Sequence, residues 1–416
     1  MKVYLRTFGC RANHYDTEQV RALVTSAGHE VVASVADADM AVFNSCAVTA
    51  DAEAELRKVV RRAARQRPGL RSVVMGCAAA LDEGRSPERR IRDLPTVQAV
   101  VGGADLPAIA NALDLDGVGG TIASVQTSTR ALLRVQDGCD EHCTFCATTM
   151  ARGPNRSRSI EALVREAETL ADSHSEIVIT GIHIGTYGTD IGTSLGELMT
   201  RLIAAVPQAR FRLSSIEATE VDDALADLLA NARRHLAPHI HAPLQSGSDR
   251  LLRRMGRHWY TSATYSARLE RIATRLSVFG LGADVITGFP GETDADHGAT
   301  VALVSGLPFT YLHVFPYSPR PGTAAERLPA PVAPALAKER AAELRSLAEQ
   351  KAGAYAASRV SGTADVVVVG RADEREGITG DYLSVRLADR ALPRGARFAA
   401  RLSMNEENRL VAQSAE

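Results

Sequence analysis

Residues 131–146, ALLRVQDGCDEHCTFC, place three cysteines within eight residues, directly after an apolar run that predicts a buried strand. The cysteines are Cys139, Cys143 and Cys146, spaced C-x3-C-x2-C, and no fourth cysteine lies nearby. Three thiolates on one loop can hold three corners of a 4Fe-4S cluster and leave the fourth iron open. The alternatives are structural zinc with His142 as a fourth ligand, or cysteines that only pack, but zinc sites favour paired C-x2-C spacings.

The same strand opens a series of six strand-like runs with helical patterns between them. The runs are ALLRVQ, EIVITG, FRLSSI, HIHAPL, GADVITG and YLHVFPYS, all between residues 131 and 318. Such alternation predicts an α/β fold, here an incomplete parallel (β/α)6 barrel over residues 131–345. Chemistry in a barrel of this kind lies at the carboxyl ends of the strands.

Residues 1–116 also alternate between apolar runs and amphipathic segments. The runs KVYLRTF, MAVFNSC and RSVVMGC predict a parallel α/β sheet domain with helices on both faces. Cys10, Cys46 and Cys77 each close one of these strands, and the carboxyl ends of parallel strands share one edge. They can converge on a second three-cysteine cluster, or they can be buried cysteines that act as small hydrophobic residues.

The remaining segments complete the predicted domain organisation. Residues 117–130 are rich in Gly, Ser and Thr and predict a linker, and residues 346–362 predict a connecting helix. Residues 363–416 hold the β-type runs TADVVVV, DYLSVRL and ARFAARLSM, which predict a small β-barrel.

Composition narrows the class of protein. The chain has 416 residues, 45 % hydrophobic and 23 % charged, with a formal net charge of −1, so overall charge gives no attraction to nucleic acid or to an anionic membrane. The first residues lack the apolar core of a signal peptide and no run reaches the roughly 18 apolar residues of a membrane span, so we expect a cytoplasmic protein without a membrane partner. In a reducing compartment the six cysteines are better explained as ligands or reactive thiols than as disulfides. The oligomeric state stays open.

A C-x3-C-x-aromatic-C loop after the first strand of a six-unit barrel resembles the radical S-adenosylmethionine (SAM) superfamily. The resemblance implies that SAM binds the open iron and is cleaved to a 5′-deoxyadenosyl radical. It also implies that several residues lie near SAM: Phe145 near the adenine, the carbonyls of Thr180 and Gly181 near the amino group, Ser215 and Glu217 near the ribose or carboxylate, and Gly288 at a close approach.

The whole chain resembles the methylthiotransferase family, which joins a three-cysteine domain, a radical SAM barrel and a TRAM module. The resemblance rests on TFGCRANHYDTE, FNSCAVTADAE, MGCAA, QDGCDEHCTFC, ARGPNRSRS, PLQSGSDRLLRRMGRHW, VITGFPGET and FPYSPRPGTAA. ARGPNRSRS and TGIHIGTYG look most like the branch that acts on N6-threonylcarbamoyladenosine at position 37 of tRNA. ATTMARG after Cys146 departs from the Pro-aromatic pair that relatives place there.

This resemblance implies a tRNA methylthiotransferase with two 4Fe-4S clusters and SAM as cofactors. Its partners would be the anticodon stem-loop of tRNA, an electron donor such as flavodoxin or ferredoxin, and a sulfur donor. Arg152, Arg156 and Arg158 follow the cluster loop and are predicted to face the substrate. Alternatives are methylthiolation of isopentenyladenosine in tRNA or of an aspartate in a ribosomal protein, and a zinc-stabilised RNA-binding protein without enzymatic activity.

Overall fold

The computed structural model describes residues 1–86, 89–115, 125–370, 376–388 and 392–415. The chain forms two compact units. The first, the N-terminal unit, contains residues 1–127, 136–156 and 318–326. The second, the barrel unit, contains residues 128–135, 157–317 and 327–416. The loop with Cys139, Cys143 and Cys146 therefore packs with the N-terminal sheet, although its flanking strand belongs to the barrel.

The N-terminal unit is built on a five-stranded parallel sheet of order β2-β1-β3-β4-β5. Its strands are β1 (Lys2–Thr7), β2 (Glu30–Val32), β3 (Met40–Ser45), β4 (Arg71–Gly76) and β5 (Val97–Gly102). Its helices are α1 (Arg11–Ser26), η1 (Val35–Asp37), α2 (Ala50–Gln66), α3 (Cys77–Ala80), α4 (Leu106–Ala112) and α5 (Thr148–Arg152). The three predicted strands are confirmed as β1, β3 and β4, and the structure adds β2 and β5 at the two edges of the sheet.

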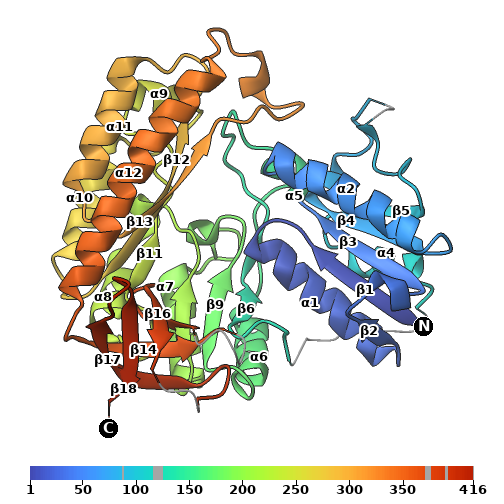
Figure 1. Ribbon diagram of the computed structural model, residues 1–416, viewed down its shortest axis with the longest axis horizontal. Helices are drawn as coiled ribbons and strands as arrows, with labels where there is room; N and C mark the ends of the chain where they lie inside the picture. Colours follow the sequence, from blue (N-terminus) through green and yellow to red (C-terminus); the bar gives the residue numbers. More distant parts are fainter. Residues whose placement is uncertain (87–88, 116–124, 371–375, 389–391, 416) are drawn as a thin grey trace. The chain divides into compact units, whose positions relative to one another are not determined.

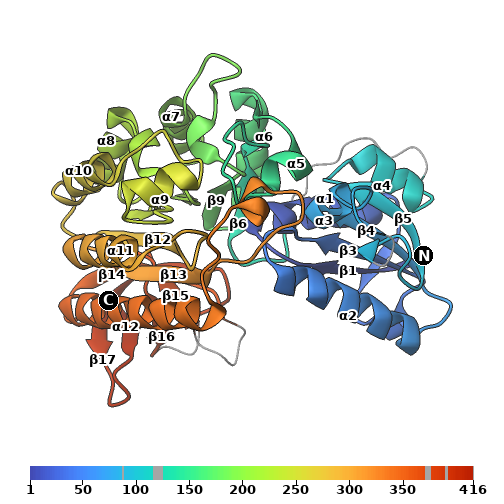
Figure 2. The same cartoon turned by 90° about the horizontal axis from the view of Figure 1, so that it is seen from above.

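Each face of this sheet has its own hydrophobic core. On one face α2 packs Leu56 and Val60 against Phe43 of β3. On the other face α1 and α4 cover Met40 and Met75. Figure 2 shows α2 and α4 on opposite sides of the sheet. Burial of each such side chain stabilises the fold by about 1.5–3 kcal/mol, so the strand ends that carry the cysteines are held on a rigid support.

The barrel unit confirms the predicted incomplete barrel of six parallel strands. Two three-stranded sheets, β10-β9-β6 and β11-β12-β13, are joined by a bridge between Ser215 and His241. The strands are β6 (Ala131–Arg134), β9 (Glu176–Thr180), β10 (Arg210–Leu213), β11 (His239–His241), β12 (Gly280–Thr287) and β13 (Tyr311–Pro316). The helices are α6 (Ile160–Ala171), α7 (Leu195–Ala205), α8 (Asp223–Asn231), α9 (Asp249–Arg254), α10 (Ser262–Ala273) and α11 (Asp294–Gly306), with short turns η3 (Ile184–Thr186) and η4 (Ala218–Glu220). A further short turn, η5 (Ala324–Arg327), belongs to the N-terminal unit except for its last residue. Two short strands, β7 (Gln136–Asp137) and β8 (Arg156–Ser157), flank the cysteine loop.

One continuous helix, α12 (Pro334–Ser358), runs along β13 (Figure 1). Ala341 and Leu344 of this helix belong to the barrel core. The expected boundary between residues 345 and 346 therefore falls within the helix. Of the expected linker, residues 117–124 lie outside the described residues.

The chain ends in a closed five-stranded barrel of order β14-β15-β16-β18-β17, which confirms the predicted C-terminal β-barrel. Its strands are β14 (Thr363–Val368), β15 (Glu376–Thr379), β16 (Ser384–Leu387), β17 (Arg397–Met404) and β18 (Leu410–Ser414). Closure pairs the strand edges that would otherwise be exposed to other chains.

Buried charges join this small barrel to the amino ends of β9 and β10. The Glu176 carboxylate accepts hydrogen bonds from Arg210 Nε at 2.6 Å and Arg212 Nε at 2.8 Å. The two guanidinium groups also donate to the main-chain carbonyls of Asp365 and Gly380 at 2.7 and 2.9 Å. Burial alone would raise the pKa of Glu176, but these arginines hold it well below its normal value. The carboxylate is thus a fully buried anion that both arginines share at this interface.

No helix in the described part of the chain is long and apolar enough to cross a membrane.

Candidate iron-sulfur sites

The structure brings Cys10, Cys46 and Cys77 together at the carboxyl edge of the N-terminal sheet. Cys10 precedes the first turn of α1, Cys46 follows β3 directly, and Cys77 opens α3 after β4. The sulfurs of Cys10 and Cys77 both lie 3.8 Å from Asn13 Oδ1. Gly9 has a φ of +99°, and a Cβ there would lie 2.6 Å from Cys46 Sγ. Glycine is therefore required beside this cysteine cluster for both its backbone conformation and its small size.

Burial disfavours the thiolate form of two of these three cysteines. It raises the pKa of Cys77 to about 11 and also raises the pKa of Cys46 above its ordinary value. Iron binds thiolates, and a bound cation supplies the charge that removal of these protons requires. The donor set fits a cluster held by three cysteines, since the chain's other three cysteines all lie on the separate loop.

A buried arginine contacts this group of cysteines. Arg152, at the end of α5, is 4 % exposed, and its Nε lies 3.1 Å from Cys77 Sγ. A second nitrogen, Nη2, donates to Asn13 Oδ1 at 2.7 Å and to Asp16 Oδ2 at 2.8 Å. Arg152 follows Cys146 by only six residues in the sequence, so α5 links the cysteine loop to the N-terminal cysteines. The predicted contact of Arg152 with substrate stays a prediction, and the contacts in the structure point to a role at Cys77.

The loop that carries Cys139, Cys143 and Cys146 is shaped by local hydrogen bonds. Cys139 N–H donates to the Gly153 carbonyl at 3.0 Å, and Thr148 N–H lies 3.3 Å from Cys146 Sγ. Gly138 has a φ of +75°, and a Cβ there would lie 1.8 Å from the Pro154 carbonyl oxygen. The glycine of QDGC is therefore needed for the loop to close. All three cysteines are partly exposed, in contrast to the buried Cys46 and Cys77.

A cavity of about 180 Å³ lies in the same unit. Ala47 and Ala147, the residues that follow Cys46 and Cys146, both line it. Glu53, Arg85 and Arg320 give its wall both signs of charge, and Glu53 and Arg85 form an ion pair. The other lining residues include Met150 of the unusual ATTM segment, together with Leu81, Gly84, Pro321 and Gly322. The residues that follow one cysteine of each group thus border one space.

The predicted SAM-contacting residues divide between the two units. Phe145 lies on the cysteine loop and is partly buried. In the barrel unit, the Thr180 carbonyl accepts from Val135 N–H at 2.9 Å, Gly181 follows directly, and Ser215 is exposed beyond the end of β10. Their roles toward SAM stay predictions.

Two of the predicted SAM-contacting residues have structural partners within the barrel unit. Glu217 is buried, which raises its pKa, and it forms an ion pair with Arg257. Gly288 has a φ of +74°, and a Cβ there would lie 2.3 Å from the Ala337 Cβ of α12. Packing against α12 is thus a sufficient reason for glycine at position 288, and its contact with SAM stays a prediction.

Arg156 and Arg158 have different surroundings. The Arg156 side chain is 55 % exposed, and its Nη2 donates to the Arg152 carbonyl at 3.0 Å. Arg158 donates to the Arg134 carbonyl at 2.9 Å and forms a 2.7 Å ion pair with Glu166. Of the two, Arg156 has the side chain that is more available to a substrate.

Sequence reasoning missed the polar residues that surround the N-terminal cysteines. Asn13 and Asp16 lie one turn apart in α1, directly after Cys10, within TFGCRANHYDTE. Arg320, within FPYSPRPGTAA, is buried and close enough to Cys46 to lower the thiol's pKa in opposition to burial. All three residues stand in motifs on which the family resemblance rests. Membership of those motifs is the sequence feature that could have identified them.

Comparison with known proteins agrees with this architecture. Residues 2–102 match the uncharacterized protein family UPF0004, and residues 133–304 match the radical SAM superfamily. The chain is 34% identical to the threonylcarbamoyladenosine tRNA methylthiotransferase MtaB of Bacillus subtilis, over 92% of this chain and 89% of that protein. It is 35% identical to MtaB of Thermotoga maritima, over 83% and 82% of the two chains. It is 33% identical to a tRNA-2-methylthio-N(6)-dimethylallyladenosine synthase of Sorangium cellulosum, over 89% and 82%.

Among solved structures, the radical SAM methyltransferase TsrM of Kitasatospora setae shares the fold. The TM-score is 0.52 at 16% identity, with 78% of this chain and 77% of that chain covered. The chain belongs to the radical SAM methylthiotransferase family and is an enzyme of that class. This membership sets aside the alternative of a zinc-stabilised RNA-binding protein without enzymatic activity.

Proposed function

We propose that this enzyme attaches a methylthio group to C2 of N6-threonylcarbamoyladenosine at position 37 of tRNA, with SAM and two 4Fe-4S clusters as cofactors. The observation that carries the proposal is the placement of both incomplete cysteine triads in one unit, where the residues after Cys46 and Cys146 line a single cavity. The names of the Bacillus subtilis and Thermotoga maritima relatives support this substrate.

The two cysteine triads would have different roles in the reaction. Cys139, Cys143 and Cys146 would hold the cluster that binds SAM, while Cys10, Cys46 and Cys77 would hold the second cluster and the sulfur to be donated. When bound, the first cluster supplies the electron that cleaves SAM, which gives access to a C–H bond that no side-chain base could deprotonate near neutral pH. The protein's part is to position the groups around the common cavity and to limit the access of water.

Recognition of the anticodon stem-loop requires exposed cations, and the net charge of −1 requires that they be local. Lys58, Arg61, Arg62 and Arg65 are exposed along α2. Together with Arg156 they would contact the phosphates of tRNA. Turnover would also need an external electron donor, such as flavodoxin or ferredoxin, and a sulfur donor.

Nucleoside mass spectrometry of tRNA tests the proposed substrate. In cells that lack this protein, we expect the 2-methylthio derivative of threonylcarbamoyladenosine to disappear while the unmodified nucleoside accumulates. The wild-type chain should restore it, and a chain with Ala at positions 10, 46 and 77 should not. An unchanged level of the derivative in the deletion strain would refute the proposal.

The same measurement separates the alternatives. The similarity to the dimethylallyladenosine enzyme of Sorangium cellulosum favours isopentenylated adenosine as the second candidate substrate. Loss of the methylthio form of that nucleoside alone would identify this branch. Methylthiolation of a ribosomal-protein aspartate predicts unchanged tRNA and a mass change in the ribosomal protein.

Arg152 offers a test of the second cluster. Hydrogen bonds to ligand sulfurs raise the reduction potential of an iron-sulfur cluster. We expect Arg152→Lys, which keeps the charge but loses the forked contact with Cys77 and Asp16, to lower the potential of the second cluster and to leave SAM cleavage intact. Redox titration followed by electron paramagnetic resonance measures the shift. Arg156→Lys, four residues further on and exposed, is the matched control, and equal potentials in the two variants would contradict a role for Arg152 at Cys77.

A further inference from the structure

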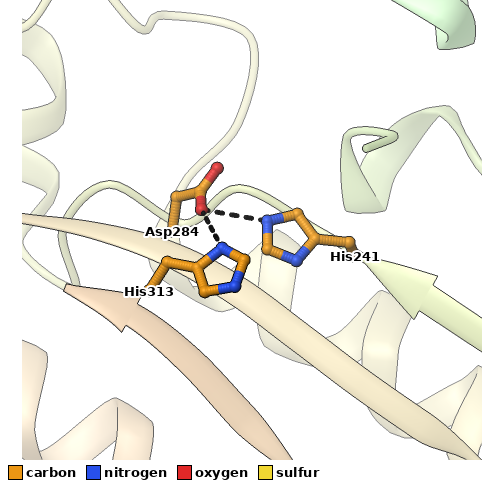
Figure 3. Close-up of side chains that lie close together, drawn as sticks. All are labelled: His241, Asp284 and His313. Carbon is orange, nitrogen blue, oxygen red and sulfur yellow. Dashed lines mark hydrogen bonds and ion pairs between the residues drawn. The ribbon is translucent and has the colours of Figure 1, made fainter. Parts of the chain in front are cut away.

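Three potential metal ligands converge on the inner face of the barrel unit, at a place that the proposed chemistry does not use. His241 ends β11, Asp284 lies within β12, and His313 lies within β13 (Figure 3). The strands are adjacent and parallel, and the register pairs His241 with Gly282 and Asp284 with His313. The convergence is therefore fixed by the sheet and does not depend on a loop.

Side-chain alternation places these three groups away from the outer helices. Ile240, Leu281, Ala283 and Val285, their neighbours on the strands, belong to the hydrophobic core shared with α10 and α12. His241, Asp284 and His313 consequently point to the opposite face, which is the interior of the incomplete barrel. The His313 side chain is 53 % exposed there, which gives a hydrated ion a route of entry.

The donor atoms have the spacing of a coordination polyhedron. Asp284 Oδ1 lies 3.0 Å from His241 Nε2 and 3.2 Å from His313 Nδ1, and all three ligand atoms lie within 4.8 Å of one another. Metal–ligand bonds of about 2.0–2.2 Å, as zinc makes with histidine and carboxylate, separate neighbouring ligand atoms by roughly 2.9–3.6 Å. Two edges of such a site, both at Asp284 Oδ1, are thus already formed, and the third edge, between the two histidine nitrogens, is no longer than 4.8 Å.

A hydrogen bond to the second ring nitrogen, the one that does not face Asp284, also orients the His241 ring. Its Nδ1 lies 3.0 Å from Tyr311 Oη, and that hydroxyl lies 2.8 Å from His239 Nε2. Tyr311 fits over Gly282, where a Cβ would lie 2.0 Å from the ring carbon Cζ. Metal-binding histidines usually have such a partner on the second ring nitrogen, because it fixes the tautomer and the ring plane.

We propose that His241, Asp284 and His313 form a binding site for a divalent transition-metal ion such as Zn²⁺, separate from the cysteines and with open coordination positions facing the barrel interior. Two histidines and one carboxylate are a ligand set that both zinc and ferrous iron accept. The competing explanation is a hydrogen-bonded pair of neutral histidines on one carboxylate, which binds no ion.

Zinc binding to the full-length, cluster-reconstituted protein tests the site. Under anaerobic conditions and in competition with a chromophoric chelator, we expect one zinc per chain beyond the reconstituted iron. X-ray absorption at the zinc edge should show nitrogen and oxygen ligands without sulfur. His313→Ala and Asp284→Asn should each weaken zinc binding at least a hundredfold, and Tyr311→Phe roughly 10- to 100-fold, as expected for loss of an outer partner.

The matched control is His297→Ala, which removes a histidine that pairs with Glu343 at 2.7 Å. This variant should bind zinc as the wild type does. Thermal unfolding and iron content are measured for every variant, and Asp284→Asn keeps the shape of the side chain. Absence of the additional zinc, sulfur ligands in the absorption spectrum, or equal affinity in Asp284→Asn and His297→Ala would each overturn the proposal.

Discussion

Replacement of Cys139, Cys143 and Cys146 by alanine is expected to abolish reductive cleavage of SAM. Without the three thiolates the loop cannot hold the cluster that would bind SAM and deliver the electron. The loop itself should persist, because its closure depends on Gly138 and on the bond from Cys139 N–H to the Gly153 carbonyl. Formation of 5′-deoxyadenosine with dithionite as reductant, measured by chromatography, should fall to the background of protein-free samples.

The other triad supplies the matched control. Replacement of Cys10, Cys46 and Cys77 by alanine should leave SAM cleavage intact but stop transfer of sulfur to tRNA. Iron and sulfide content should fall by about half in each triple variant, which separates loss of one cluster from a general failure to load iron. Methylthio product from the Cys10, Cys46 and Cys77 variant would show that the second cluster is not the sulfur site.

Glu176→Gln is expected to destabilise the barrel unit by about 3–5 kcal/mol, the usual cost of removing one partner of a buried ion pair. Arg210 and Arg212 are fully buried, and loss of the carboxylate removes the anion that they share and leaves Arg210 with the partly exposed Asp365 as its acidic partner. The arginines also hold the carbonyls of β14 and β15, so the C-terminal barrel should loosen as well. The urea midpoint and limited proteolysis measure the two effects.

Acidification should remove the stability that the ionised Glu176 carboxylate contributes to the wild-type protein. The pKa of Glu176 in the folded state lies well below the value of about 4.3 in an unfolded chain. Its contribution to stability is therefore complete above that unfolded value and is lost as the pH falls below it. The difference in urea midpoint between wild type and Glu176→Gln should narrow below about pH 4.

An exposed ion pair provides the comparison for Glu176. Asp227 pairs with Arg275 on the surface, and both side chains are at least one-third exposed. Asp227→Asn should change stability by no more than about 1 kcal/mol. A Glu176→Gln variant as stable as Asp227→Asn would contradict the structural role assigned to the buried cluster.

The sequence predicted the parts of the fold that have strong local signals. The six barrel strands and β1, β3 and β4 are apolar runs, and each was recognised. The edge strand β2 was missed because three residues, Glu30–Val32, are too short to show a period. The strands β15 and β18 were missed because closure of the small barrel, which no local pattern reveals, decides their pairing.

The candidate sites divide in the same way. The loop cysteines are visible in spacing, and Cys10, Cys46 and Cys77 are visible because each ends a strand. Arg152 read as a substrate-facing cation because it stands in an arginine-rich run. Its burial depends on Asp16, 136 residues earlier, and no spacing rule connects the two. The group of His241, Asp284 and His313 was likewise missed, since only the register of three strands brings it together.

The packing of residues 136–156 with the N-terminal sheet has a consequence for how such proteins diverge. Ala151 lies in a hydrophobic core of that sheet, and Arg152 is neutralised there by Asp16. In a recombinant chain whose first hundred residues came from a relative, the cysteine loop would pack against an N-terminal sheet from a different protein. The loop and the sheet should therefore be inherited together, and the natural point of exchange between family members would lie within the barrel, after the arginine.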